Sequence, residues 1–174
     1  MKIGTLETER LYLRSFKKSD AKFAIGIWND PVMGEYLADE AMREISEDYL
    51  REIENLADDN QCCYMIAELK ENRERVGTCS FIPCNDGKVY DIAYCVHKNY
   101  WRKGFATEMI LGMIDYATKR GAKKITVCVD KNNTGSNAVM KKLGFTVAEE
   151  NSYKKRGTDR ICEDYKYEFH LQTD

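Results

Sequence analysis

The sequence predicts an α/β domain of the α+β kind, with a mixed central sheet of six to seven strands and about four helices. Two observations carry this prediction. Three strand-like segments separated by short turns predict an antiparallel meander, and a strand, a helix and another strand then follow over about forty residues. Because such a crossover makes its two strands parallel, the sheet should contain both parallel and antiparallel strand pairs.

The N-terminal part should supply one strand and two helices. Residues 10–16 alternate like a half-buried strand, and residues 20–29 predict a helix that Asp30-Pro31 stops. In the second helix, Ser46 can cap the N-terminus, while the acidic pair Glu47 and Asp48 suits the positive end of the helix dipole. Its apolar residues recur at helical spacing: Tyr49, Leu50, Ile53, Leu56 and Ala57.

The central part contains the meander and the crossover. Strands are predicted over 62–69, 76–83 and 89–97, with turn residues between them. A helix should then run from about Gly104 to Gly121, because its apolar residues recur at helical spacing. The alternating residues Ile125, Val127 and Val129 predict the strand that follows.

The C-terminal part should add a short helix over 136–143 and strands near 145–150 and 162–171. The basic segment 154–157 between these strands is expected to be a solvated hairpin tip. No internal repeat, low-complexity stretch or linker interrupts the pattern, so residues 1–174 should form a single domain.

Composition excludes several classes of function. Basic residues (27) and acidic residues (29) nearly balance, so we expect no general attraction to nucleic acid or to an anionic membrane. No apolar run approaches a membrane span or a signal core, which favours a cytoplasmic protein. The seven cysteines are expected to be reduced, and the two histidines lack a second ligand at metal spacing, so no metal site is predicted.

The junction between the strand ending near His97 and the helix beginning near Gly104 is suited to an anion. A helix start exposes unpaired N–H groups and the positive end of the dipole, and Gly104 has no side chain to block them. Arg102, Lys103 and Thr107 add polar donors that suit a diphosphate. Alternatively, Gly104 only permits a tight turn. The segment contains neither a P-loop nor a dinucleotide fingerprint.

Together with a second block, this junction closely resembles the GNAT superfamily of acetyltransferases. The first block is 100–107, Tyr-Trp-Arg-Lys-Gly-Phe-Ala-Thr, and the second is 133–145, Asn-Thr-Gly-Ser-Asn-Ala-Val-Met-Lys-Lys-Leu-Gly-Phe. Trp101 stands where the family usually has Arg or Gln. This variation, with the opening segment 8–14, resembles the Rim-type branch, whose members acetylate N-termini of ribosomal proteins.

The resemblance implies the GNAT fold, with a sheet splayed between the fourth and fifth strands, and acetyl-CoA as cosubstrate. The pantetheine arm of coenzyme A would fill the gap and pair with the backbone of Tyr94, Cys95 and Val96. The other implied cofactor contacts are Arg102, Lys103, Gly104, Phe105, Ala106, Thr107, Asn133 and Ser136. Asn133 could instead be only a turn residue.

Acetyl transfer to an amine needs an oxyanion donor, an acid for the leaving thiolate and a neutral amine. The resemblance implies a backbone N–H near Cys95 or Val96 for the first role. For the second it implies Ser136, because Met140 stands where many members have Tyr; Ser136 could alternatively cap its helix. Asp91 and Glu68 are the candidate bases, unless both are paired surface carboxylates or no side chain acts as base.

The acceptor side is expected to be acidic. Residues 35–59 contain ten acidic and two basic residues, a bias that would attract a cationic amine, although it could also mark only a solvated helix face. The acceptor should be a protein or peptide N-terminus or a small amine. The alternatives are a polyamine or aminoglycoside, or a protein that binds coenzyme A as a sensor without turnover. We expect a monomer or homodimer.

Overall fold

A computed structural model describes residues 3–42 and 44–171, and its eight-stranded sheet has the order β1-β2-β3-β4-β5-β6-β8-β7. The strands are β1 (Leu6–Glu7), β2 (Leu11–Ser15), β3 (Cys63–Leu69), β4 (Arg75–Cys84), β5 (Val89–Val96), β6 (Lys124–Asp130), β7 (Thr146–Lys154) and β8 (Ile161–His170). The α-helices are α1 (Ala21–Trp28), α2 (Glu47–Asn55), α3 (Phe105–Lys119) and α4 (Thr134–Lys142). Short 3-10 helices cover Lys18–Asp20, Leu56–Asp58 and Lys98–Tyr100.

The predicted mixed sheet is confirmed, but the predicted strand number of six to seven is wrong. The additional strand, β1, has two residues and pairs with β2 through Leu6 and Leu13. It was missed because two residues are too few to show an alternating pattern. The β5–β6 pair is parallel, as the crossover through α3 requires, and the other pairs of the described sheet are antiparallel.

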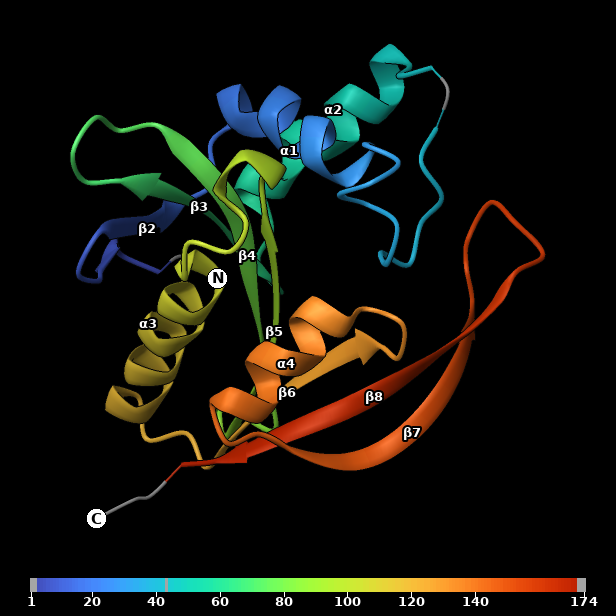
Figure 1. Cartoon of the computed structure of the whole chain (residues 1–174). Coiled ribbons are helices and arrows are strands. Elements are labelled where there is room, and N and C mark those ends of the chain that lie inside the picture. The colour runs from blue at the N-terminus through green and yellow to red at the C-terminus, as the bar shows by residue number, and fades with distance from the viewer. Residues whose placement is uncertain (1–2, 43, 172–174) are drawn as a thin grey trace.

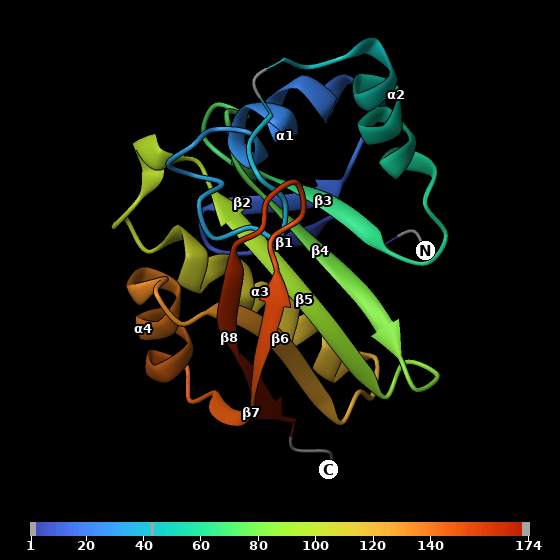
Figure 2. The same ribbon diagram turned by 90° about the vertical axis from the view of Figure 1, so that its right-hand side faces the viewer.

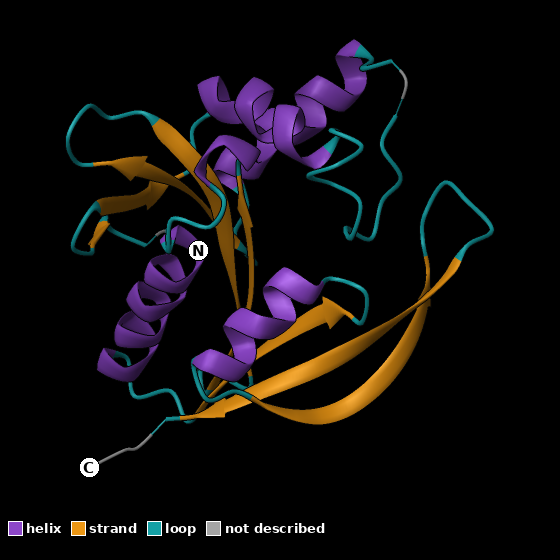
Figure 3. Ribbon diagram, viewed as in Figure 1, coloured by secondary structure: helices purple, strands orange, loops and turns teal. Residues whose placement is uncertain are grey.

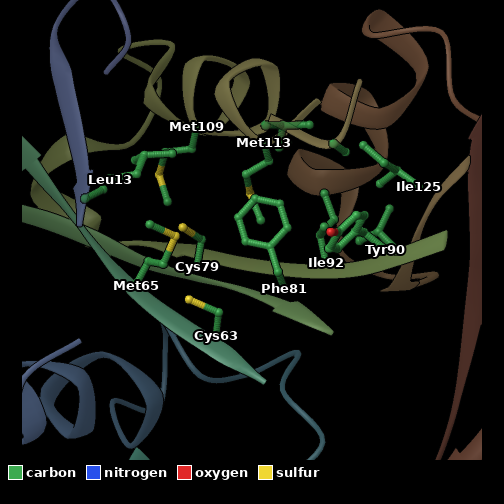
Figure 4. Close-up of a cluster of buried hydrophobic side chains, with 14 of the residues drawn as sticks. Leu13, Cys63, Met65, Cys79, Phe81, Tyr90, Ile92, Met109, Met113 and Ile125 are labelled. Atoms are coloured by element: carbon green, nitrogen blue, oxygen red, sulfur yellow. The ribbon is translucent and has the colours of Figure 1, made fainter. Parts of the chain in front are cut away.

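Helices cover both faces of the sheet (Figure 1, Figure 3). On one face α3 packs on the strands, and Figure 4 shows Met109 and Met113 of this helix over Met65, Phe81 and Ile92 of the sheet. On the other face α1 and α2 form a second apolar cluster. It contains Phe16, Ala21, Ala24, Ile25, Ile53 and Ile66. No helix in the described ranges is long and apolar enough to cross a membrane.

The sheet splits between β5 and β6. Their parallel pairing covers only the first three residues of each strand, from Val89 opposite Lys124 to Asp91 opposite Thr126. Beyond that point β5 stays with β4, whereas β6 stays with β8 and turns away, as Figure 1 and Figure 2 show. The expected splay between the fourth and fifth predicted strands is therefore confirmed, and a gap opens toward the N-termini of α3 and α4.

Candidate active site

A cleft of about 580 Å³ occupies the gap between the diverging ends of β5 and β6. Four segments supply its walls: the end of β5, the end of β6 and the first turns of α3 and α4. The loop that follows α1 covers part of the opening with Met33 and Tyr36. The cleft thus joins the two sequence blocks that were predicted to act together.

The backbone of β5 presents to this cleft hydrogen-bonding groups that no longer pair with β6. The His97 N–H donates to the Val76 carbonyl at 2.8 Å, toward β4. Because successive residues of a strand turn their main-chain groups to opposite sides, Cys95 also turns its N–H and carbonyl toward β4. Tyr94 and Val96 therefore point their main-chain groups the other way, toward the cleft. This alternation shows that the cleft-facing N–H near the expected oxyanion position belongs to Tyr94 or Val96, not to Cys95.

The same argument applies to β6 on the opposite wall. The Leu171 N–H donates to the Lys123 carbonyl at 2.9 Å, which places the hydrogen-bonded positions of the β6–β8 pair at Ile125, Val127 and Val129. Cys128 therefore turns its main-chain N–H and carbonyl toward β5, which has already diverged. Two strand edges with free polar groups face each other across the cleft, an arrangement suited to an extended ligand with amide groups.

The N-terminus of α3 closes one end of the cleft. Gly104 precedes the helix with φ of 83°, in the left-handed region, and a Cβ there would meet only the Arg10 guanidinium, at 3.4 Å. The Glu108 N–H donates to the Gly104 carbonyl at 3.0 Å and is the first intrahelical donor. The preceding N–H groups of Phe105, Ala106 and Thr107 have no intrahelical acceptor, so they can bind an anion.

Glu108 and Arg10 hold this turn in place. The Thr8 hydroxyl and the Arg10 N–H each donate to Glu108 Oε1 at 2.6 Å, and Arg10 Nε donates to Oε2 at 2.7 Å. The Arg10 guanidinium also bonds to the Lys103 carbonyl and lies 4.3 Å from the centre of the Phe105 ring. Burial raises the pKa of Glu108, but these hydrogen bonds outweigh it and hold the pKa below its usual value.

The remaining residues of this junction have different positions. Arg102 lines the cleft with φ of 61°, whereas the Lys103 ammonium lies 5.2 Å from the centre of the Tyr100 ring and Lys103 does not line the cleft. The Trp101 indole N–H donates to the Val96 carbonyl at 2.6 Å. Trp101 therefore ties the loop before α3 to the cleft-facing edge of β5, a structural contact that the sequence pattern did not predict.

The N-terminus of α4 forms the adjoining wall. Asn133 caps this helix, because its Oδ1 accepts from the Ser136 N–H at 3.0 Å. The alternative interpretation of Ser136 as the cap is therefore wrong: Ser136 lies inside the first turn and lines the cleft. Asn137 fixes the loop between β6 and α4, since its amide donates to the carbonyls of Asp130, Lys131 and Asn133.

The Tyr94 side chain reaches into the same region from β5. Its hydroxyl is buried and has no hydrogen-bond partner within the described residues. Burial raises the pKa of Tyr94 to about 12, although the nearby Ser136 hydroxyl opposes this shift. A buried hydroxyl without a partner is costly in a folded protein, and it suits a site that a polar ligand completes.

The two candidate bases lie outside the residues that line the cleft. Glu68 on β3 is ion-paired with Arg14 at 2.7 Å and lies 3.6 Å from the Arg73 guanidinium. Asp91 on β5 accepts a hydrogen bond from the Thr126 hydroxyl at 2.7 Å, where the strands are still paired. Burial raises the pKa of Asp91, opposed by that hydrogen bond.

The carboxylate in the cleft wall is instead Asp130, the last residue of β6. Its side chain is 4% exposed, and it lines the cleft together with Tyr36 from the loop after α1. Sequence reasoning missed both residues. The sequence did contain a signal for Asp130. This acidic residue directly follows the buried strand residues 125–129 and precedes the Asn132-Asn133 turn, so it stands at the strand end where the crossover strands diverge.

Comparison with known proteins decides the family. Residues 10–146 match the acetyltransferase (GNAT) domain. The chain belongs to the GNAT family of acetyltransferases. A relative, the uncharacterized N-acetyltransferase p20 of Bacillus licheniformis, is 33% identical over 146 residues, which cover 81% of this chain and 82% of the relative. This GNAT protein is thus an N-acetyltransferase, and its cosubstrate is acetyl-CoA.

Solved structures show the same fold. Spermidine N-acetyltransferase from Vibrio cholerae, in complex with CoA and spermine, matches with a TM-score of 0.80 and 19% identity, covering 93% of this chain and 96% of that chain. The ribosomal L7/L12 alpha-N-protein acetyltransferase RimL, in complex with coenzyme A, matches with a TM-score of 0.79 and 15% identity, covering 98% and 100%. Neither likeness singles out the Rim-type branch.

Proposed function

We propose that this GNAT enzyme transfers the acetyl group from acetyl-CoA directly to a primary amine, with both substrates bound in the cleft between β5 and β6. The observation that carries the proposal is the cleft itself. It is lined by two unpaired strand edges and ends at the free N–H groups of α3. An extended arm with amide groups and a terminal diphosphate matches both features.

In this proposal the diphosphate binds the N–H groups of Phe105, Ala106 and Thr107, and Gly104 leaves room for it. Arg102 adds a cationic side chain at the cleft wall. Lys103 contributes positive charge from outside the cleft, because its ammonium lies over Tyr100. The site therefore neutralises the anion mainly with backbone groups, which a change of side chain does not remove.

The pantetheine arm would pair with the cleft-facing main chain of Tyr94 and Val96, and Cys95 would only shape the strand between them. The Val96 carbonyl already accepts from Trp101, which leaves the Val96 N–H and the main-chain groups of Tyr94 for the arm and the thioester oxygen. Asn133 would hold the arm from the α4 side while it caps that helix.

The cysteines of the cleft favour direct transfer over a covalent acetyl-enzyme. Burial raises the pKa of Cys95 to about 12, and burial with the neighbouring Asp164 and Asp91 raises the pKa of Cys128 to about 11. A thiol reacts as the thiolate, so neither side chain is an efficient nucleophile near neutral pH. The amine of the acceptor would attack the thioester itself.

Ser136 would donate a proton or hydrogen bond to the departing thiolate. It lines the cleft from the first turn of α4, and the unpartnered Tyr94 hydroxyl lies near it. The leaving group is the thiolate of coenzyme A, and these two hydroxyls would be the donors nearest to it. Asp91 could still remove the amine proton only through intervening water, since it does not line the cleft.

The acceptor would be a protein or peptide N-terminus or a small amine, and the protein would act in the cytoplasm as a monomer or homodimer. Structural neighbours with a spermidine or a ribosomal-protein substrate in their names support both acceptor classes. The acidic excess of residues 35–59 supports a cationic acceptor, including a polyamine or aminoglycoside.

The test is release of free thiol from acetyl-CoA in the presence of a basic peptide, spermidine or an aminoglycoside. We expect one class to accelerate release, with a rate that depends on both substrates at once. Coenzyme A binding without thiol release for any of the three amines would contradict the proposed transfer. A burst of acetylated protein before amine addition would contradict direct attack.

A further inference from the structure

Asp130 is a buried carboxylate at the wall of the cleft, and no salt bridge to it forms within the described residues. Its Oδ1 accepts from the Asn132 N–H at 2.8 Å, and its Oδ2 accepts from the Tyr153 hydroxyl at 3.1 Å. No Lys, Arg or His side chain of the described chain forms an ion pair with it. Each carboxylate oxygen has one donor and can accept more, so Asp130 can still bind a cation.

A second carboxylate lies beside it. Asp164 on β8 is the direct partner of Asp130 in the strand ladder, so the two side chains project from the same face of the sheet. The Oδ1 of Asp164 is buried and has no hydrogen-bond partner within the described residues. Like charges directly opposite each other on adjacent strands repel, and a buried unpartnered oxygen adds to that cost.

The cations of the neighbouring strands are engaged elsewhere. Lys131 lies 2.7 Å from Glu150, and Lys166 lies 3.3 Å from Glu149. Arg160 is close enough to interact with Asp130 electrostatically, but its Nε donates to Cys162 Sγ at 3.3 Å. The pair of carboxylates therefore lacks a direct positive partner from the β7–β8 side.

The loop after α1 completes the surroundings. Burial, with Glu35 and Asp130 nearby, raises the pKa of Tyr36, and the Arg160 guanidinium opposes this shift. The β7–β8 hairpin holds this loop in place, because the buried Lys155 donates to the Glu35 carbonyl at 2.5 Å and Arg156 pairs with Asp39. Asp130 and Tyr36 thus line the cleft together, and Tyr153 and Asp164 adjoin Asp130 outside that lining.

We infer that Asp130, with Tyr36, binds the ammonium group of the acceptor, while Tyr153 and Asp164 act on the Asp130 carboxylate from outside the cleft lining. This inference rests on the proposed function and extends it to particular side chains. An alkylammonium has three N–H donors and one positive charge, which match the remaining acceptor positions of the Asp130 carboxylate and the Tyr36 phenol oxygen. A divalent metal fits less well, since no group of three or more His, Cys, Asp or Glu side chains that could hold one exists in the described chain.

The binding test uses putrescine as a cationic probe and butanediol as its neutral counterpart, titrated calorimetrically into protein saturated with coenzyme A. We expect the wild-type protein to bind putrescine and not butanediol. Asp130→Asn should weaken putrescine binding by at least about tenfold, and Asp164→Asn, which removes a charge beside Asp130, should weaken it by a smaller factor. The matched control is Asp115→Asn, an exposed carboxylate of α3 that pairs with Lys119, and it should leave the affinity unchanged.

A melting experiment separates binding from misfolding. Without amine, Asp164→Asn should raise the melting temperature because it removes repulsion from Asp130, and putrescine should then stabilise this variant less than the wild-type protein. Equal putrescine affinity in all variants, or no binding by wild-type protein that does bind coenzyme A, overturns the inference. Failure of the wild-type protein to bind coenzyme A would instead overturn the proposed function.

Discussion

The two halves of the cleft differ in the groups that they present: one presents mainly backbone groups and the other mainly side chains. The proposed cofactor half consists of backbone groups: the N-terminus of α3 and the edge of β5 that has left β6. The proposed acceptor half consists of side chains, with Tyr36 and Asp130 in the cleft wall and Tyr153 bonded to Asp130 outside it. Backbone groups persist when side chains change, whereas a side-chain site changes with each substitution. One fold can therefore keep a single acyl donor while its acceptors vary.

The largest expected effect comes from the residue that joins the two halves. Asn137→Ala should lower the free energy of unfolding by about 3 kcal/mol, because the buried amide bonds to three carbonyls and its Oδ1 accepts from the Tyr167 hydroxyl at 2.8 Å. Chemical denaturation measures this. The exposed Asn151→Ala on β7 is the control, and an equal loss in both variants would contradict the role of Asn137.

Ser136→Ala tests whether the cofactor half also depends on a side chain. We expect turnover to fall by about a hundredfold, with the affinity for coenzyme A unchanged, because the hydroxyl would act only on the departing thiolate. Steady-state kinetics and calorimetry measure the two quantities. Ser136→Thr keeps a hydroxyl and should recover part of the rate. Wild-type turnover in Ser136→Ala would remove this residue from the mechanism.

Glu108→Gln tests the support of the anion-binding turn. The folded-state pKa of Glu108 lies below its usual value, so its contribution to stability is present at neutral pH and is lost as the pH falls through the folded pKa. The variant should therefore lose about 1–2 kcal/mol at neutral pH and show a flatter acid dependence than the wild-type protein. Parallel acid unfolding curves would show that the Arg10 and Thr8 contacts do not stabilise the charged form.

The smallest expected effect concerns the ion pair that joins the β7–β8 hairpin to the loop after α1. Arg156→Ala removes an exposed ion pair with Asp39 and should change the free energy of unfolding by less than about 1 kcal/mol. The KM for the acceptor amine should rise modestly, because the loop carrying Tyr36 is held less firmly, while the KM for acetyl-CoA should not change. An equal rise in both KM values would show that the two halves are not independent.

This difference between the halves also explains which parts of the fold and of the site could be predicted from the sequence. The crossover, the meander and the helix start at Gly104 depend on local periodicity and a single glycine, so the sequence pattern predicted them. Asp130 had a local signal at the end of its strand, but Tyr36 and Tyr153 approach it only through the divergence of β6 and the return of the β7–β8 hairpin, which leave no local pattern. Asn133 and Ser136 are both good capping residues, so only the structure could assign the cap.

The central claim is that backbone N–H groups at the start of α3 hold the diphosphate of the cofactor. Calorimetric titration of coenzyme A into Gly104→Glu and Gly121→Glu tests it directly. Both glycines have positive φ, 83° and 73°, so the backbone strain is matched, and a Cβ would meet only the Arg10 guanidinium at Gly104 and nothing within 4 Å at Gly121, which lies at the far end of α3. Gly104→Glu should weaken binding by at least about a hundredfold, and Gly121→Glu should leave it nearly unchanged. Equal affinities in the two folded variants would contradict the claim.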